Sequence, residues 1–69
     1  MQKIDACIAV KAEIDKAQRN GEKISPTEAI ERVDIKKPNK PDESFSATTI
    51  RRQLGDTYFE MLSQYAKRP

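Results

Sequence analysis

The sequence predicts an all-α fold: a small domain of three helices, or four if the last one is split, with a long loop before the last helix. Three observations indicate this fold. Gly21 stops one helical pattern, Ser25 caps the next, and apolar residues recur at helical spacing from Ile50 to Tyr65. No segment alternates apolar and polar residues as a half-buried strand does. With 69 residues, the chain (1–69) is expected to form a single helical domain.

The first helix is expected over residues 2–19. Asn20-Gly21 ends it, because glycine can adopt the left-handed conformation that closes a helix. Lys11 falls inside the apolar stripe of this helix, so either the stripe is not fully buried or Lys11 lays its methylene groups along it. The stripe consists of Ile4, Cys7, Ile8, Ile14 and Ala17, with Val10 on its flank.

The second helix is expected over residues 26–33, and its start is the clearest in the chain. Ser25 is the N-cap, Pro26 occupies the first turn, where no amide donor is needed, and Glu28 completes a capping box. Ile24 is expected to pack back onto the first turn as a hydrophobic staple. The buried side of this helix is expected to be Ala29, Ile30 and Val33.

Residues 34–45 are expected to form a linker or long loop. Two prolines, an asparagine and alternating charges exclude a regular helix in this segment. The apolar residues Ile35 and Phe45 are expected to anchor the two ends of the loop.

The third helix is expected over residues 47–66. Gly55 interrupts it, and Gly55-Asp56 could divide it into two helices, the second capped by Asp56. Its apolar arc, at 100° per residue, is Ile50, Leu54, Tyr58, Met61, Leu62 and Tyr65. Phe59 lies opposite this arc, which makes it a candidate for a contact between two copies of so small a chain. The expected homodimer interface is Tyr58, Phe59, Leu62 and Tyr65.

The start of the third helix carries side chains that can recognise DNA. Ser46 is a good N-cap, because its hydroxyl can accept hydrogen bonds from free backbone amides of the first turn. Arginine and glutamine can make paired hydrogen bonds to guanine and adenine edges, and threonine can contact bases or phosphates. The residues expected to face outward are Thr48, Thr49, Arg52 and Gln53, while Ala47, Ile50 and Leu54 are expected to face the core.

The run Ser46-Ala47-Thr48-Thr49-Ile50-Arg51-Arg52-Gln53-Leu54 resembles the recognition helix of helix-turn-helix repressors, several of which carry a Ser-x-x-Thr-Ile-Arg-Arg-type pattern. The resemblance implies a helix-turn-helix-like protein that binds double-stranded DNA, as a transcriptional repressor or a plasmid or phage regulatory factor. Base contacts would come from the outward-facing residues above. Phosphate contacts would come from Ser46, Arg51, Lys36, Lys37 and Lys40.

Two features depart from the helix-turn-helix pattern. The loop 34–45 is much longer than the usual turn of about three or four residues. No strand pair is indicated after the last helix, so a winged version is not expected. The alternative hypothesis is a helical protein–protein interaction module, such as a phage-encoded inhibitor or an adaptor, anchored by Tyr58, Phe59 and Tyr65.

Charge and composition narrow the function further. Residues 1–34 carry six basic and seven acidic side chains (net −1), whereas residues 35–69 carry seven basic and four acidic ones (net +3). This mild basic bias is compatible with a surface that faces phosphates. No segment is apolar enough to cross a membrane or to serve as a secretory signal, so a cytoplasmic protein is expected, and a bacterial or phage origin would fit.

An enzyme is not expected. The chain has no histidine for acid–base chemistry or for a cysteine–histidine metal site, and its two glycines cannot form a glycine-rich phosphate loop. So small a bundle has no room for a large pocket, so no cofactor, no metal and no catalytic residue is predicted. Cys7 is the only cysteine, which excludes an internal disulfide. It is expected to be a small buried side chain, although Lys3 and Lys11 one turn away leave a reactive thiol open.

Overall fold

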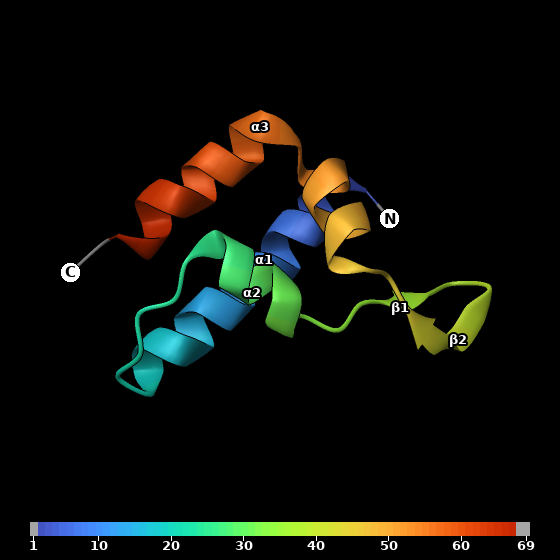
Figure 1. Cartoon of the computed structure of the whole chain (residues 1–69), viewed down its shortest axis with the longest axis horizontal. Helices are drawn as coiled ribbons and strands as arrows, with labels where there is room; N and C mark the ends of the chain where they lie inside the picture. The colour runs from blue at the N-terminus through green and yellow to red at the C-terminus, as the bar shows by residue number, and fades with distance from the viewer. Residues whose placement is uncertain (1, 68–69) are drawn as a thin grey trace.

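The computed structural model describes residues 2–67. Along the chain, α1 (Lys3–Arg19) and α2 (Pro26–Arg32) are followed by a two-stranded hairpin and by α3 (Ala47–Ala66). The strands are β1 (Lys36–Lys37) and β2 (Lys40–Ser44). α1 packs against both α2 and α3, and the hairpin projects from one end of the helical part (Figure 1). The three predicted helices are present, but the fold is not purely α-helical because of the hairpin.

α1 ends where the sequence predicts. The Glu22 amide donates to the carbonyl of Ala17 at 2.8 Å, and the Gly21 amide donates to that of Gln18 at 3.0 Å. These two bonds form a Schellman motif, which requires a left-handed residue after the helix. Gly21 supplies it with φ 80°.

α2 begins with the predicted cap. The Ser25 Oγ accepts a hydrogen bond from the Glu28 amide at 3.2 Å, and Pro26 occupies the first position of the helix. The Glu28 carboxylate, expected to complete a capping box, instead lies 3.5 Å from the guanidinium of Arg32, one turn further along. The predicted staple residue Ile24 is buried. The Ser25 hydroxyl and Pro26 therefore mark the start of this short helix.

Ser25→Ala is expected to lower the free energy of unfolding by about 1 kcal/mol, because one amide of the first turn loses its acceptor. Urea unfolding followed by circular dichroism measures the change. Ser25→Thr is the matched control, since it keeps a hydroxyl at the same position and should lose much less. Equal losses in the two variants would contradict a capping role for this hydroxyl.

Residues 34–45, predicted to form a linker or long loop, contain the two strands that make a purely α-helical fold wrong. β1 and β2 pair in antiparallel fashion, Lys36 opposite Ser44 and Lys37 opposite Lys40, with an irregularity in register between these two pairs. Pro41 lies in the irregular stretch, where a residue without an amide hydrogen is tolerated. All five residues of β2 are exposed, so the strand has no buried face and leaves no alternating pattern in the sequence.

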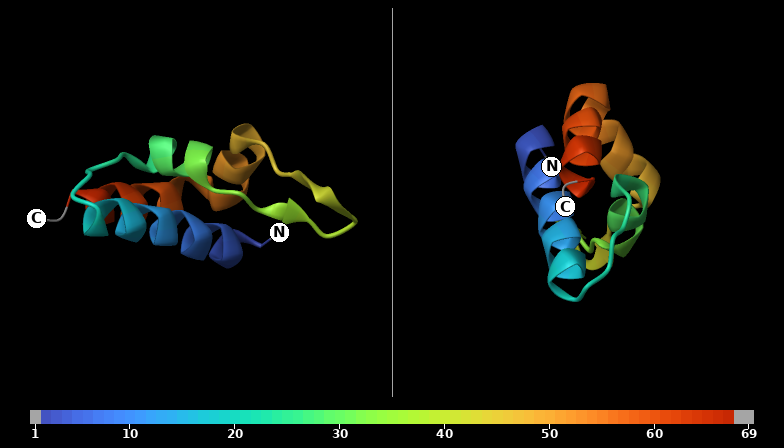
Figure 2. Two further views of the ribbon diagram at one scale, coloured as in Figure 1. Left: turned by 90° about the horizontal axis from the view of Figure 1, so that it is seen from below. Right: turned by 90° about the vertical axis from the view of Figure 1, so that its left-hand side faces the viewer.

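The base of the hairpin is closed by the two residues that the sequence predicts as anchors. Ile35 and Phe45 are partly buried against the core, and the Phe45 amide donates to the Ile35 carbonyl at 2.9 Å. The chain therefore leaves the helical part at Ile35 and returns to it at Phe45. Figure 2 shows the hairpin extending beyond the helices along the long axis of the molecule.

α3 is divided at Gly55, one of the two possibilities that the sequence leaves open. Gly55 has φ 74° and ψ 172°, which is not helical. We refer to residues 47–54 as α3a and to residues 56–66 as α3b. The ribbon changes direction between them (Figure 1), so that α3a packs near α2 while α3b runs along α1.

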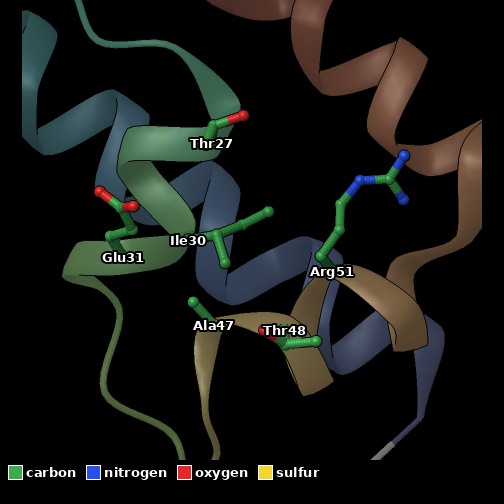
Figure 3. Close-up of a pocket in the computed structure, with 6 residues that line it drawn as sticks. All are labelled: Thr27, Ile30, Glu31, Ala47, Thr48 and Arg51. Atoms are coloured by element: carbon green, nitrogen blue, oxygen red, sulfur yellow. The ribbon is translucent and has the colours of Figure 1, made fainter.

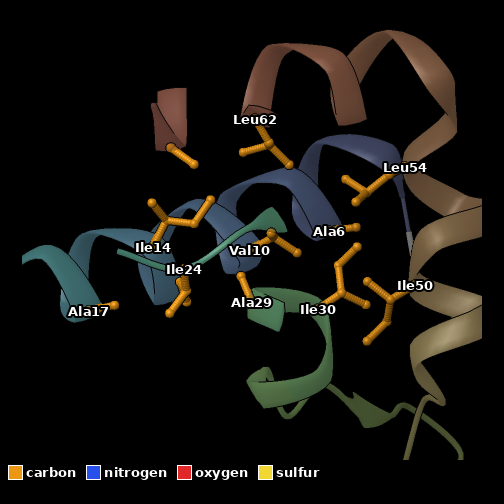
Figure 4. Packing of buried hydrophobic residues seen from close by; sticks show 11 residues of the cluster. Ala6, Val10, Ile14, Ala17, Ile24, Ala29, Ile30, Ile50, Leu54 and Leu62 are labelled. Carbon is orange, nitrogen blue, oxygen red and sulfur yellow. The ribbon is translucent and has the colours of Figure 1, made fainter. Parts of the chain in front are cut away.

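The core lies between α1, α2 and both parts of α3 (Figure 4). Its largest fully buried side chains are Ile14, Ile50, Leu54 and Val10. Within residues 2–67, the buried hydrophobic residues are Ala6, Val10, Ile14, Ala17, Ile24, Ala29, Ile30, Ile50, Leu54, Leu62 and Ala66, and Pro26 at the start of α2 is buried as well.

Part of the predicted core is exposed. In α1, the side chains of Ile4 and Ile8 are 55% and 62% exposed, and the buried line passes instead through Ala6 and Val10. Alanine at the centre of the buried face lets the neighbouring helices come close, and this moves the contact away from the larger isoleucines. Cys7, expected to be buried, is half-buried beside this line.

The predicted arc of the third helix fails for a different reason. Met61, expected in the apolar arc, is 56% exposed, and Phe59, expected on the opposite side, is partly buried against the core. The arc assumed one continuous helix, and the non-helical backbone at Gly55 changes the direction in which every later side chain points. Ala47, expected to face the core, is also exposed.

Candidate nucleic-acid interface

α3a presents a short polar face to solvent. Ser46 caps the helix, since its Oγ accepts from the Thr49 amide at 3.2 Å and lies 2.9 Å from the Thr49 hydroxyl. Thr48 and Arg52 are exposed, whereas Thr49 and Gln53 are half-buried. Of the four residues predicted to contact bases, Thr48 and Arg52 are thus the two that extend freely from α3a.

Arg51, predicted to contact phosphate, is engaged within the chain. Its guanidinium lies over the ring of Phe59, 4.0 Å from the centroid, and 3.1 Å from the carboxylate of Asp56. These contacts join α3a to α3b across Gly55. The Asp56 side chain is 99% exposed, so this is a surface ion pair, which stabilises the fold only weakly.

The hairpin lysines are also paired. Lys36 lies 3.2 Å from the carboxylate of Asp34, and Lys37 and Lys40 lie 3.4 and 3.6 Å from that of Glu43. The pKa of Asp34 is lowered from its ordinary value, because the Ser44 hydroxyl and then Lys36 stabilise its charged form. Residues 34–44 carry three lysines and three acidic residues, so this segment has no net charge. The structure therefore does not place a basic patch on the hairpin.

A shallow hollow of about 290 Å³ lies between α2 and α3a. Thr48 and Arg51 line one side of it, and Thr27, Ile30 and Glu31 of α2 line the other (Figure 3). Its volume is at the lower end of the range for sites that hold small molecules. The carboxylate of Glu31 also makes this hollow less favourable for a phosphate than α3a alone would be.

The residues predicted for a dimer interface are mostly engaged within the chain. Leu62 is only 2% exposed, and Phe59 lies beneath Arg51. The Tyr65 hydroxyl donates to Asp15, and Lys11 lies 5.0 Å from the centroid of the Tyr65 ring. Tyr58, the fourth, is half-buried against the core.

Among the described residues 2–67, the exposed large apolar side chains are Ile4 and Ile8 of α1 and Met61 of α3b. The apolar patterns of the sequence place all three in the core, so they do not indicate this exposed surface. Their exposure depends on how α1 and α3b are rotated in the packed molecule, and neither helix shows this rotation by itself.

Comparison with protein-family models, with curated proteins and with solved structures gives no match to this chain. Within residues 2–67, no helix is both long and apolar enough to cross a membrane. The same part of the chain contains no group of three or more cysteine, aspartate or glutamate side chains that could hold a metal ion.

Proposed function

We propose that the chain is a small helix-turn-helix-like protein that binds double-stranded DNA with α3a in the major groove. It would act as a transcriptional repressor or as a plasmid or phage regulatory factor. The observation that carries the proposal is the outward face of α3a, where Thr48 and Arg52 are exposed on a capped helix. Arg52 has no ion-pair partner within residues 2–67, unlike Arg51. Arginine is the side chain most often used to read guanine in the major groove.

The cations that form ion pairs within the chain would contribute phosphate contacts rather than base contacts. Surface ion pairs contribute about 0–1 kcal/mol, so Lys36, Lys37 and Lys40 can exchange a carboxylate for a DNA phosphate at small cost. Arg51 would also have to leave Phe59 to reach a phosphate. We therefore assign base contacts to Thr48 and Arg52, with Thr49 and Gln53 at the margin, and phosphate contacts to the lysines and the capped end at Ser46.

Arg52→Ala is expected to weaken binding to a preferred DNA site by about 1–3 kcal/mol and binding to scrambled DNA much less, because a base contact carries the sequence preference. The site is first selected from a pool of random duplexes, and affinities are then measured by fluorescence anisotropy. Lys36→Ala should weaken binding to both duplexes about equally, as a phosphate contact does. Arg19→Ala, which removes an exposed arginine from α1, is the matched control and should change neither affinity.

The parent protein is measured at two salt concentrations in the same assay. Binding to phosphates weakens steeply as salt rises, because counterions are released from DNA. Absence of duplex binding at low salt would contradict the proposal, and so would an Arg52→Ala variant with unchanged affinity for the selected site.

A second candidate function is binding to a protein partner. The exposed side chains of Ile4, Ile8 and Met61 favour it, because clustered apolar residues on a surface mark interaction sites. Such binding would depend little on salt, which separates it from DNA binding in the assay above.

A further inference from the structure

One side of α1 combines exposed apolar and charged residues in a regular order. Asp5, Ile8, Ala12 and Lys16 are all exposed and follow one another at spacings of three and four residues, so they lie on one side of the helix. We call these four residues the outer face of α1. Ile8, at 62% exposed, is the most exposed large apolar side chain on this face.

α3b extends this surface. It runs parallel to α1, because Lys3 lies beside Gly55 where α3b begins and Asp15 accepts a hydrogen bond from Tyr65 near its end. In this register Met61 lies level with the middle of α1. Met61 is 56% exposed, so apolar surface continues from α1 onto α3b.

The charges at the two ends of the outer face, Asp5 and Lys16, differ from several other charges of residues 2–67 in forming no ion pair. Arg32 of α2, the three hairpin lysines and Arg51 of α3a form ion pairs with neighbouring carboxylates. Between residues 2 and 67, in contrast, neither Asp5 nor Lys16 has an ion-pair partner. A negative charge therefore stands at one end of an apolar surface and a positive charge at the other.

We propose that this face binds a second copy of the chain, with the two α1 helices antiparallel. The two-fold axis crosses the outer face at the level of Val10 along the helix. In this arrangement Ile8 packs against the small side chain of Ala12 in the second copy, and Asp5 meets Lys16. Each contact occurs twice, as two-fold symmetry requires. A parallel arrangement would instead place Asp5 beside Asp5 and Lys16 beside Lys16, so the charges favour the antiparallel one.

The apolar and charged contacts require the same axis. The midpoint between Ile8 and Ala12 is Val10, and the midpoint between Asp5 and Lys16 lies between Val10 and Lys11. These positions differ by less than about 1 Å along the helix. Asp5 and Lys16 also lie on the same side of Ile8 around the helix. In an antiparallel pair related by a two-fold axis, this side of one helix faces the same side of the other, so Asp5 can reach Lys16 of the second copy. The interface is thus centred on α1, with Met61 at its edge, rather than on Phe59 and Leu62.

Sedimentation equilibrium over a range of concentrations tests the proposal. The parent chain should approach twice the monomer mass of 7.9 kDa in the upper micromolar range. Ile8→Glu should raise the dissociation constant of the dimer about a hundredfold or more, because a charge would be buried against Ala12. Ile8 is exposed in the single chain, so the variant should keep its fold, which circular dichroism checks. Thr27→Glu, with the same change of charge on an exposed residue of α2, should leave the dimer intact.

A charge exchange tests the antiparallel register. Asp5→Lys and Lys16→Glu should each weaken the dimer about tenfold, because each places like charges together. The double variant D5K/K16E should recover most of the parent affinity, since opposite charges face each other again. Both single changes also oppose the helix dipole of α1, but the double variant opposes it twice and could not recover on that basis.

A parent chain that stays monomeric throughout would overturn the proposal. So would a dimer that Ile8→Glu leaves intact, or a double variant weaker than both single ones. A chain that stays monomeric and binds a different protein through this face would also overturn the proposal. No DNA is present in these measurements, so their outcome is independent of DNA binding.

Discussion

Ile14→Ala is expected to lower the free energy of unfolding by about 2–5 kcal/mol, the usual cost of truncating a buried isoleucine. Ile14 is 1% exposed and lies on the face of α1 that packs against the rest of the core. A chain of this size has a total stability of about 3–10 kcal/mol at typical values per residue. The variant should therefore be largely unfolded well below the melting temperature of the parent, as circular dichroism on heating would show.

Ile8→Ala is the matched control, because it makes the same chemical change in the same helix. Ile8 is 62% exposed, so the loss should be about 0.5 kcal/mol or less, measured at concentrations where the chain is monomeric. The apolar stripe that the sequence suggests includes both residues and would predict similar losses. Similar losses in experiment would mean that the rotation of α1 described above is wrong.

Gly55→Ala is expected to destabilise the chain by about 1–3 kcal/mol, because φ 74° with ψ 172° is a conformation essentially restricted to glycine. Space is not the obstacle. An added methyl group would meet only the flexible end of Lys3, at 3.4 Å. The cost is therefore one of backbone conformation, and urea unfolding measures it.

Gly21→Ala is the control for this variant. Gly21 also has a positive φ, of 80°, and an added methyl group there has nothing within 4 Å. It occupies the left-handed position after a helix, where a non-glycine residue costs about 1–2 kcal/mol. Alanine is about 1 kcal/mol better than glycine inside a helix, so a stabilising Gly55→Ala would indicate that α3 is continuous in solution.

The helices could be predicted because their ends are determined by local contacts. Ser25, Ser46 and Gly21 act on amides and carbonyls a few residues away, and these interactions are visible in the sequence as caps and stops. The rotation of each helix about its own axis is determined by contacts between elements. That is why the exposure of Ile8 and Met61 differs from the prediction.

In the candidate site, too, features that depend on local contacts are predicted and features that depend on contacts between elements are not. The sequence predicts the cap at Ser46 and the outward direction of Thr48 and Arg52, since these depend on one helix. It does not predict that Arg51 lies on Phe59, because this contact exists only once the backbone turns at Gly55. Nor does it predict the pairing of the hairpin lysines, which requires β1 and β2 to form first.

The hydrogen bond from Phe45 to Ile35 makes the connection between α2 and α3a shorter in space than it is in sequence. The nine residues between Ile35 and Phe45 bring the chain back to where it left, so the spatial link consists of the few residues on either side of the closure. In engineering terms the hairpin is an insertion whose ends already meet. A short turn could replace it without moving either helix, and a longer peptide could be grafted at Pro38-Asn39. The length of this segment can therefore vary without altering the packing of the core.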